Sequence, residues 1–128
     1  MAPKNAMEMV SEAKGRITNL SVEEFAKEME SGNAVVIDVR EKEELAEQGF
    51  IPGAVHAPRG MLEFYADPSH PLHKSEFSPE KRLLLHCASG GRGALACDML
   101  QGMGYSNVAN LESGFKGWKE AGKPSEKI

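Results

Sequence analysis

Short apolar segments alternate with amphipathic segments along most of this chain. The apolar segments predict strands at residues 17–20, 35–39, 82–86 and 108–111, with a brief fifth strand at 55–56. Between them, the spacing of apolar and charged positions predicts helices at residues 22–29, 41–48, 91–103 and 114–121. Strands that are apolar along their whole length are typical of a parallel sheet with both faces covered. The pattern therefore predicts an α/β domain of three layers: an open, mostly parallel sheet of about five strands with helices on both faces.

Local signals fix two of the predicted helix ends. Ser21 can cap the first helix, because Glu24 stands three residues later, as in a capping box. The last helix should stop at Gly122, with Pro124 just beyond it.

Two segments fall outside this alternation. Residues 67–81 contain prolines among polar residues, and a loop of this length in a small domain is often a lid or a binding loop, so we expect it on the surface. Residues 1–16 carry only a weak helical pattern, which predicts a loosely packed extension. We therefore divide the chain into an N-terminal extension (1–16), one domain (17–124) and a C-terminal tail (125–128).

The size and charge of the chain exclude several classes of protein. With 128 residues it has room for one domain. Its formal net charge of -4 leaves no general basic surface for nucleic acid. No apolar stretch approaches the roughly 20 residues needed to cross a bilayer, and residues 1–15 lack the apolar core of a secretory signal. We expect a cytoplasmic protein that binds neither nucleic acid nor membrane.

Two cysteines are too few for a disulfide scaffold, so a reactive thiol is the more informative feature. Cys87 follows a predicted buried strand, and open α/β sheets bind ligands at the carboxyl ends of their strands. Ser89, Gly90 and Gly91 allow the following backbone to curl, so that its N–H groups and the start of the next helix can hold an anion. With Arg92, this loop can stabilise a thiolate, whereas an inert buried cysteine needs none of these residues.

The second cysteine, Cys97, lies inside the helix predicted at 91–103, among apolar neighbours and with no adjacent cation. We interpret it as a packing residue. No disulfide to Cys87 is expected, because a helix that rises about 1.5 Å per residue separates the two Cα atoms beyond the roughly 7 Å limit.

Two rival interpretations use other features. The sequence Gly-x-Gly-x-x-Ala at 91–96, with Glu112 further on, matches a dinucleotide fingerprint, but too few residues follow it to complete the βαβ units that carry a dinucleotide. Four histidines raise the question of a metal site, yet only His70 and His73 are close in sequence, and zinc takes three or four protein ligands. We expect neither a metal ion nor another cofactor.

Several segments of the chain carry the motifs of a known family. They are VIDVRE at 36–41, GFIPGA at 49–54, and the loop at 87–92 followed by GYSNV at 104–108 and LESGFKGW at 111–118. Together they resemble the rhodanese-like sulfurtransferase domains, over about residues 17–124. The resemblance implies a parallel five-stranded sheet with helices on both sides. It also implies an enzyme whose cysteine persulfide accepts sulfane sulfur from a donor and passes it to a nucleophile, with no cofactor.

The resemblance assigns roles to particular residues. Cys87 matches the catalytic position, and Asp38 and Arg40 match a pair that shapes the region around the loop. The residues that match the loop holding the donor's anionic group are Ala88, Ser89, Gly90, Gly91 and Arg92.

Two positions depart from the family pattern. Phe50 replaces the histidine of the family's Gly-His-Ile-Pro-Gly-Ala motif, which we expect to affect packing more than chemistry. Ala88 stands where many thiosulfate-using members carry an arginine or a lysine, which argues against thiosulfate as the best donor. Arg59 can supply the missing charge or be an ordinary solvated arginine, and the sequence favours neither.

The expected partners are a small anionic sulfur donor, thiosulfate or a persulfide, and a thiol or protein thiolate as acceptor.

Two alternative functions stay open. A tyrosine-phosphatase or arsenate-reductase-like enzyme is one, because His86 and Cys87 followed by an arginine look like the start of a phosphate-binding loop. In that pattern five residues separate cysteine from arginine, whereas four do here, which predicts a cradle too small for a phosphoryl group. The other is a non-catalytic rhodanese-like binding module.

Overall fold

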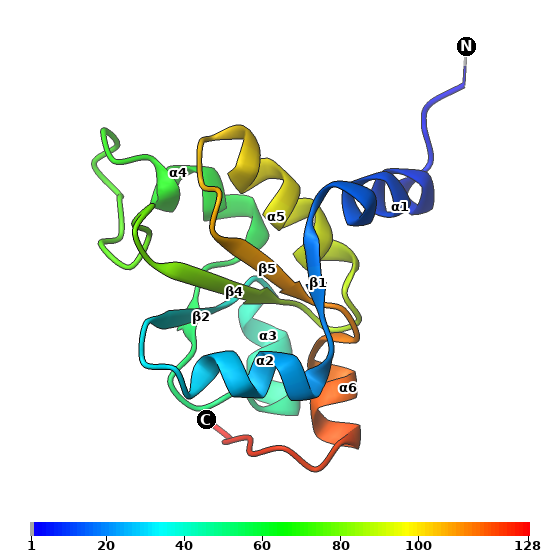
Figure 1. The fold of residues 1–128 in the computed structure, drawn as a ribbon. Coiled ribbons are helices and arrows are strands. Elements are labelled where there is room, and N and C mark those ends of the chain that lie inside the picture. The colour runs from blue at the N-terminus through cyan, green and yellow to red at the C-terminus, as the bar shows by residue number, and fades with distance from the viewer. Residues whose placement is uncertain (1) are drawn as a thin grey trace.

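The computed structural model describes residues 2–128 and contains one five-stranded sheet (Figure 1). Its strands are β1 (Thr18–Leu20), β2 (Ala34–Asp38), β3 (Val55–His56), β4 (Arg82–His86) and β5 (Val108–Leu111). The helices are α1 (Ala6–Arg16), α2 (Val22–Met29), α3 (Lys42–Gln48), α4 (Leu62–Ala66), α5 (Gly91–Gly102) and α6 (Gly114–Glu120), with a 3-10 turn, η1, at Arg59–Met61. All five predicted strands and all four predicted helices are confirmed, with ends that differ by at most one residue.

The strand order is β1-β5-β4-β2-β3, and every pair is parallel. Asp38 at the end of β2 lies opposite His86 at the end of β4, so the carboxyl ends of these two central strands meet at one edge. The predicted open α/β sheet is therefore confirmed. This order differs from the 3-2-1-4-5-6 order of dinucleotide-binding folds.

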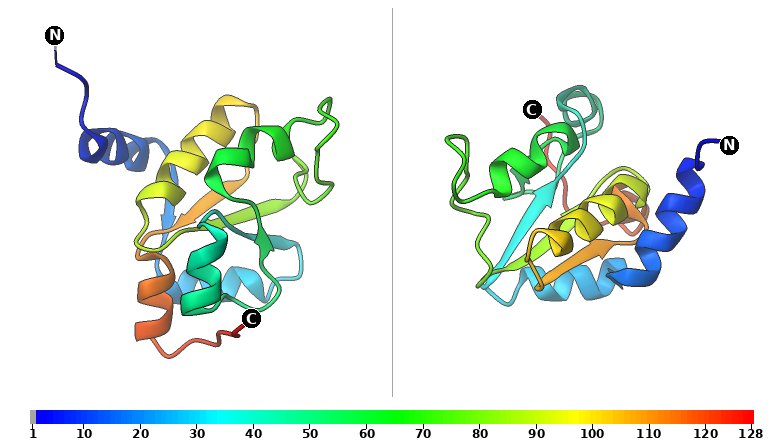
Figure 2. Two further views of the ribbon diagram at one scale, coloured as in Figure 1. Left: turned by 180° about the vertical axis from the view of Figure 1, so that it is seen from behind. Right: turned by 90° about the horizontal axis from the view of Figure 1, so that it is seen from above.

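Helices cover both faces of the sheet (Figure 2). Side chains of β4 alternate between two apolar clusters, because successive residues of a strand point to opposite faces. Leu83 and Leu85 pack with α4 and α5 on one face. Leu84 packs with α2 and α6 on the other, where Phe25 and Trp118 meet edge to face at 6.0 Å. The predicted three-layer arrangement follows from these two clusters.

The N-terminal segment differs from the loosely packed extension predicted for it. Residues Ala6–Arg16 form a regular helix, α1, capped by the Asn5 side chain. Ala13 is fully buried. Arg16 donates two hydrogen bonds to the carboxylate of Asp98 in α5, at 2.8 and 2.6 Å, and its carbonyl accepts from Gln101 at 3.0 Å. These partners lie far along the chain, so the local pattern of residues 1–16 could not reveal them.

The structure differs from the sequence prediction a second time, in the segment before β4. Residues 59–66, for which no helix was predicted, form η1 and α4. The following loop, 67–81, is anchored by Phe77, which is 2% exposed and whose carbonyl accepts from the Tyr105 hydroxyl at 3.3 Å. Because β4 begins directly after this loop, the loop lies at the end of the sheet opposite Cys87 (Figure 1). It is therefore no lid over that residue.

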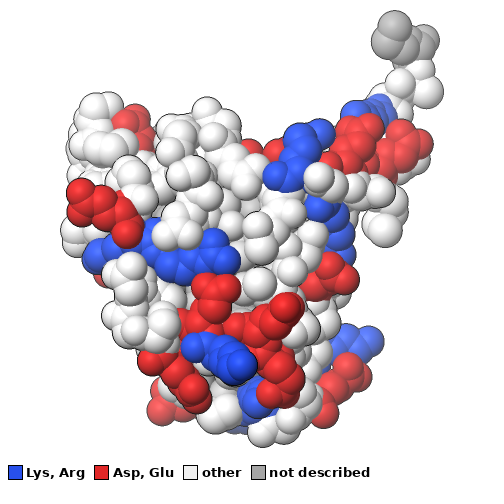
Figure 3. All heavy atoms as spheres, viewed as in Figure 1, with Lys and Arg blue, Asp and Glu red and all other residues white. Residues whose placement is uncertain are grey.

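The surface carries mixed charge. On the face shown in Figure 3, acidic and basic side chains lie side by side over α1 and α2, and a short basic band lies on the left, above α2. Within residues 2–128, no helix has both the length and the apolar character needed to cross a membrane.

Candidate active site

Cys87 follows β4 directly, at the carboxyl edge of the sheet, and is 1% exposed. Its Sγ accepts hydrogen bonds from two backbone amides, that of Gly90 at 3.1 Å and that of Gly93 at 3.2 Å. Gly93 belongs to the first turn of α5, so the sulfur lies at the positive end of the helix dipole. Amide donors and a helix N-terminus both stabilise a thiolate, the nucleophilic form of cysteine.

The backbone of the same loop offers further hydrogen-bond donors. The amides of Ser89, Gly91 and Arg92 have no hydrogen-bond acceptor within residues 2–128. Unpaired amides on a curled backbone at the start of a helix are suited to bind an anion. The loop predicted from the sequence is thus present, and its glycines and Ser89 lie around Cys87 as expected.

Glycine is required at two positions of this loop. Gly90 has a φ of +105°, which disfavours any side chain, and a Cβ there would lie 2.1 Å from the Glu112 carbonyl oxygen. A Cβ on Gly93 would lie 2.2 Å from Oδ1 of the buried Asn110. Asn110 in turn donates from Nδ2 to the Gly90 carbonyl at 3.2 Å. Sequence reasoning did not assign Gly93 or Asn110 to the site, because their contacts form only in the folded chain.

The start of α6 holds the other side of the loop. The amide of Phe115 donates to the Cys87 carbonyl at 2.8 Å, and that of Lys116 donates to the Ala88 carbonyl at 3.0 Å. Gly114 allows this approach, since a Cβ there would lie 2.4 Å from the Ala88 oxygen. The LESGFKGW segment therefore fixes the backbone at the cysteine itself.

Asp38 and Arg40 form a buried ion pair near the loop. Arg40 donates from Nε to Asp38 Oδ1 at 3.0 Å and from Nη2 to Oδ2 at 2.8 Å, and both residues are inaccessible to solvent. Burial is the largest single influence on Asp38 and acts to raise its pKa, but the hydrogen bonds from Arg40, together with the electrostatic effects of His86 and Arg40, leave the pKa lowered. The guanidinium also lies 4.2 Å from the centre of the Phe115 ring and donates to the Gly49 carbonyl at 2.9 Å. The pair thus supports Phe115, whose amide holds Cys87.

His86 belongs to the same buried layer. Its ring stacks on Phe115 with the centroids 6.1 Å apart, and Nδ1 lies 3.3 Å from the Cys87 carbonyl oxygen. Burial lowers the pKa of His86, so the ring is neutral at pH 7. Its Nε2 lies 3.6 Å from Oδ2 of Asp38 and has no hydrogen-bond partner among residues 2–128, so the ring packs between the ion pair and Phe115.

The loop arginine has a partner that the sequence did not suggest. Arg92 donates from Nη1 and Nη2 to the two carboxylate oxygens of Glu44 in α3, at 2.7 and 2.8 Å. The hydrogen bonds from Arg92 lower the pKa of Glu44 to about 2, and the same contact raises the pKa of Arg92. The Arg92 guanidinium is therefore held in a partly exposed ion pair with Glu44.

None of the remaining candidates is hydrogen-bonded to the sulfur of Cys87 within residues 2–128. Arg59, at the start of η1, donates to Glu63 at 3.0 Å. Cys97 is fully buried in the middle of α5, and burial raises the pKa of its thiol. His70 Nδ1 accepts a hydrogen bond from the Leu72 amide at 3.0 Å, and His73 Nε2 lies 3.2 Å from the Phe77 carbonyl oxygen. Residues 2–128 contain no cluster of three histidine, cysteine or carboxylate side chains that could hold a metal ion.

Comparison with known proteins gives consistent matches. A family model described as the rhodanese-like domain matches residues 21–121. A sulfurtransferase from Allochromatium vinosum is 32% identical over 92 residues, which cover 72% of this chain and 78% of that protein. The human thiosulfate:glutathione sulfurtransferase is 31% identical and is matched over 79% of this chain and 92% of its own length.

One solved structure is similar over almost the whole chain. It is a protein of unknown function from Rhodopseudomonas palustris, described as a possible tyrosine phosphatase. Its sequence is 36% identical, its TM-score is 0.92, and the match covers 98% of this chain and 97% of that one. The match therefore extends beyond the family model into α1.

Proposed function

The chain belongs to the rhodanese-like domain family, and on that premise we propose that it is a sulfurtransferase that carries sulfur as a persulfide on Cys87. The observation that supports this most strongly is the pair of hydrogen bonds from the Gly90 and Gly93 amides to Cys87 Sγ. Such hydrogen bonds favour the thiolate, which is the form of cysteine that attacks a sulfane donor.

In the first half-reaction the Cys87 thiolate attacks the sulfane sulfur of the donor. With thiosulfate, the S–S bond of the donor breaks, sulfite leaves with the electron pair of that bond, and one proton completes the persulfide on Cys87. Negative charge develops on the leaving group, and the unpaired amides of Ser89, Gly91 and Arg92 stabilise it. With an organic persulfide as donor, the leaving group is a thiolate and the same amides act on it.

In the second half-reaction the thiolate of an acceptor attacks the outer sulfur of the Cys87 persulfide. The S–S bond on the enzyme breaks, and Cys87 leaves as the thiolate that begins the next cycle. The two steps predict ping-pong kinetics, and neither requires a cofactor. Among the relatives, the human protein is named for thiosulfate and glutathione, which supports a small thiol as acceptor.

The charged residues near the loop act mainly as positioning residues in this proposal. Asp38 and Arg40 hold Phe115, and through it the carbonyl of Cys87. Arg92 ties the start of α5 to α3 through Glu44, so its charge contributes less to donor binding than its place in the sequence suggested. Arg59 acts as a surface residue, since Glu63 neutralises it.

The alternative function is that of a phosphatase, because the similar protein from Rhodopseudomonas palustris is described as a possible tyrosine phosphatase. Two features of this chain speak against it. Four residues separate Cys87 from Arg92, one fewer than in the phosphatase pattern, and the Arg92 guanidinium is engaged by Glu44. A phosphoryl group would therefore meet a smaller loop and no free arginine.

Steady-state assays of the purified protein decide between the two activities. We expect sulfite release from thiosulfate, or sulfur transfer from an organic persulfide, in the presence of a thiol acceptor, and negligible hydrolysis of aryl phosphates or reduction of arsenate under the same conditions. If the native protein hydrolyses aryl phosphates, loses that activity in Cys87→Ser and transfers no sulfur, the phosphatase is the correct function and the sulfurtransferase is not.

A further inference from the structure

The N-terminal helix α1 reaches the cysteine loop. It packs against α5, whose first residues belong to this loop (Figure 2). A Cβ on Gly91 would lie 3.6 Å from Cγ2 of Val10, and a Cβ on Gly90 would lie 3.6 Å from Nζ of Lys14. Two side chains of α1 therefore lie against two consecutive glycines of the loop. α1 precedes residues 21–121, the part of the chain that the family model matches.

Gly90 is the common neighbour of Lys14 and the sulfur. Its amide donates to Cys87 Sγ at 3.1 Å, and the side on which a Cβ would stand faces the Lys14 ammonium group. Glycine has no side chain to hold the two groups further apart. A unit charge at such a range acts on an ionisable group, and more strongly where protein excludes water.

Lys14 is held in place without a counter-charge. Its side chain is half-buried, and no carboxylate oxygen lies within 4.0 Å of its Nζ among residues 2–128. Its carbonyl accepts from Nδ2 of Asn19 at 3.0 Å. Asn110 Nδ2 lies 3.5 Å from Oδ1 of Asn19 and donates to the Gly90 carbonyl at 3.2 Å. Two asparagines thus connect the last turn of α1 with the loop.

The buried and half-buried charges on the other side of the loop are compensated. Arg92 pairs with Glu44 of α3, and Arg40 pairs with Asp38 of β2. Burial lowers the pKa of His86, which keeps this ring neutral at pH 7. None of these groups brings an uncompensated positive charge to Cys87.

The remaining charged side chains of the elements packed against the loop are exposed, and water and salt screen them. They are Glu41 before α3, Glu112 after β5, and Lys116 and Lys119 of α6. Lys14 differs from them because it is half-buried against the loop itself.

We propose that Lys14 supplies the positive charge of this site, and that its ammonium group stabilises both the Cys87 thiolate and the anionic sulfur donor across Gly90. The lysine keeps its proton throughout and forms no bond to the reactants. The part that concerns the donor rests on the proposed function, whereas the effect on the thiolate does not depend on sulfur transfer. A helix outside the family domain thereby adds to the chemistry of the site.

Alkylation of the thiol tests the charge without any sulfur transfer. The rate at which iodoacetamide modifies Cys87 is followed against pH, with the product located by peptide mapping. In Lys14→Gln and in Lys14→Met, which keeps an apolar side chain against Gly90, we expect the pH midpoint to rise by about 0.5–1 unit. Lys14→Arg keeps the charge and should restore the native midpoint.

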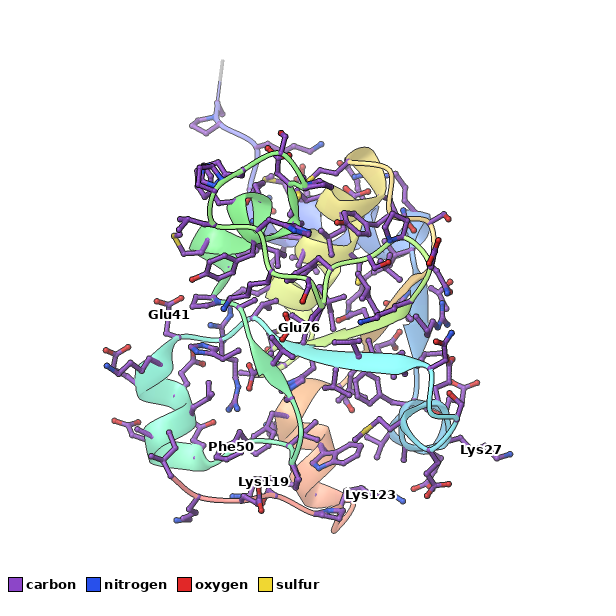
Figure 4. The ribbon with its side chains drawn as sticks, turned by 90° about the vertical axis from the view of Figure 1, so that its left-hand side faces the viewer. Lys27, Glu41, Phe50, Glu76, Lys119 and Lys123 are labelled. Carbon is purple, nitrogen blue, oxygen red and sulfur yellow. The ribbon has the colours of Figure 1, made fainter. Side chains whose placement is uncertain are left out.

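Lys27→Gln is the matched control for the loss of a lysine. Lys27 is exposed and extends outward from α2 (Figure 4), so its removal should leave the midpoint unchanged. Urea denaturation checks that each variant is folded under the conditions of the assay.

The rate of sulfur uptake tests the effect on the donor. It is measured by intact mass in single turnovers with thiosulfate, at a pH above the midpoints of all the proteins, so that differences in ionisation do not contribute. We expect the second-order rate in Lys14→Gln to be about three- to tenfold lower than in the native protein, with a smaller difference at high salt.

Three results would be decisive. An unchanged midpoint in the uncharged variants would overturn the inference. A shift that Lys14→Arg does not restore would also overturn it, because the lysine would then act by packing alone. If the midpoint shifts as expected but the native protein takes up no sulfur from any donor, the proposed function fails while the role of Lys14 toward the thiolate stands.

Discussion

The two cysteines of this protein are equally buried and yet have opposite surroundings. Cys87 and Cys97 belong to the same apolar cluster and are 1% and 0% exposed. Cys87 precedes α5, and its sulfur accepts two hydrogen bonds at the start of that helix, from the amides of Gly90 and Gly93. Cys97 lies within α5, where burial raises the pKa of its thiol. The comparison teaches that two equally buried thiols can differ in their hydrogen-bond donors: burial alone disfavours a thiolate, whereas amides at the start of a helix stabilise one.

The largest effect should come from exchanging the sulfur for oxygen at Cys87. Cys87→Ser keeps the shape of the loop but removes the atom that forms the persulfide, so we expect no measurable sulfur transfer with any donor. Far-UV and near-UV circular dichroism should match those of the native protein. A serine variant that retains activity would show that another group carries the sulfur.

A methyl group on the loop should be nearly as damaging. In Gly90→Ala, the Cβ meets the Glu112 carbonyl oxygen at 2.1 Å and the residue must keep a positive φ. We expect a loss of about 2–4 kcal/mol in the free energy of unfolding and a large loss of sulfur transfer. Gly102→Ala, at the end of the same helix, is the control, since nothing lies within 4 Å of the new Cβ. Urea denaturation should find it at least as stable as the native protein, and similar losses in both variants would argue against a strained loop.

The Arg92–Glu44 pair predicts a pH dependence of stability. The pKa of Glu44 is lowered to about 2 in the folded protein, so its contribution is fully present above its ordinary pKa of 4.5 and is lost as the pH falls toward 2. We expect Glu44→Gln to lower the free energy of unfolding by about 0.5–1 kcal/mol at pH 7, since the pair is partly exposed. This deficit should shrink below pH 4.5.

Glu43→Gln provides the control for that measurement, because Glu43 is an exposed neighbour in α3 with no ion pair within 4.0 Å among residues 2–128. A deficit in Glu44→Gln that does not change with pH would contradict the electrostatic account of the pair.

The smallest effect on catalysis should come from Cys97→Ser. The hydroxyl is buried within α5, so we expect a cost of about 1–3 kcal/mol in stability. Sulfur transfer per folded molecule should stay within about twofold of the native value, because Cys97 lies inside α5, beyond the amides that hold the Cys87 sulfur. Iodoacetamide should modify Cys97 only after unfolding. A loss of activity as large as that of Cys87→Ser would remove the distinction between the two cysteines.

Much of the fold could be predicted because its signals are local. β4 contains three consecutive leucines and β5 is largely apolar, and the capping box of Ser21 and Glu24 marks the start of α2, where the structure has it. Residues 59–66 were missed because Pro58 and Gly60 indicate a turn, and the helices that follow are short. The cysteine loop was recognisable because Cys87, its glycines and Arg92 are consecutive in the chain.

The rest of the site depends on contacts between distant residues. Glu44 stands at a position that serves the capping box of α3, and only folding brings it to Arg92. Asn110 reaches the loop from β5, and no sequence motif indicates that contact. Electrostatic partners of this kind are set by tertiary structure, which a linear pattern does not contain.

The most direct test of the account is to locate the sulfur. Native protein is incubated with thiosulfate or an organic persulfide, digested without reduction, and mapped by mass spectrometry. We expect one additional sulfur atom on the peptide that contains Cys87, none on the peptide that contains Cys97, and its loss when a thiol acceptor is added. Sulfur on Cys97, or on neither cysteine with any donor, would contradict the claim that the amides at the start of α5 make Cys87 the sulfur carrier.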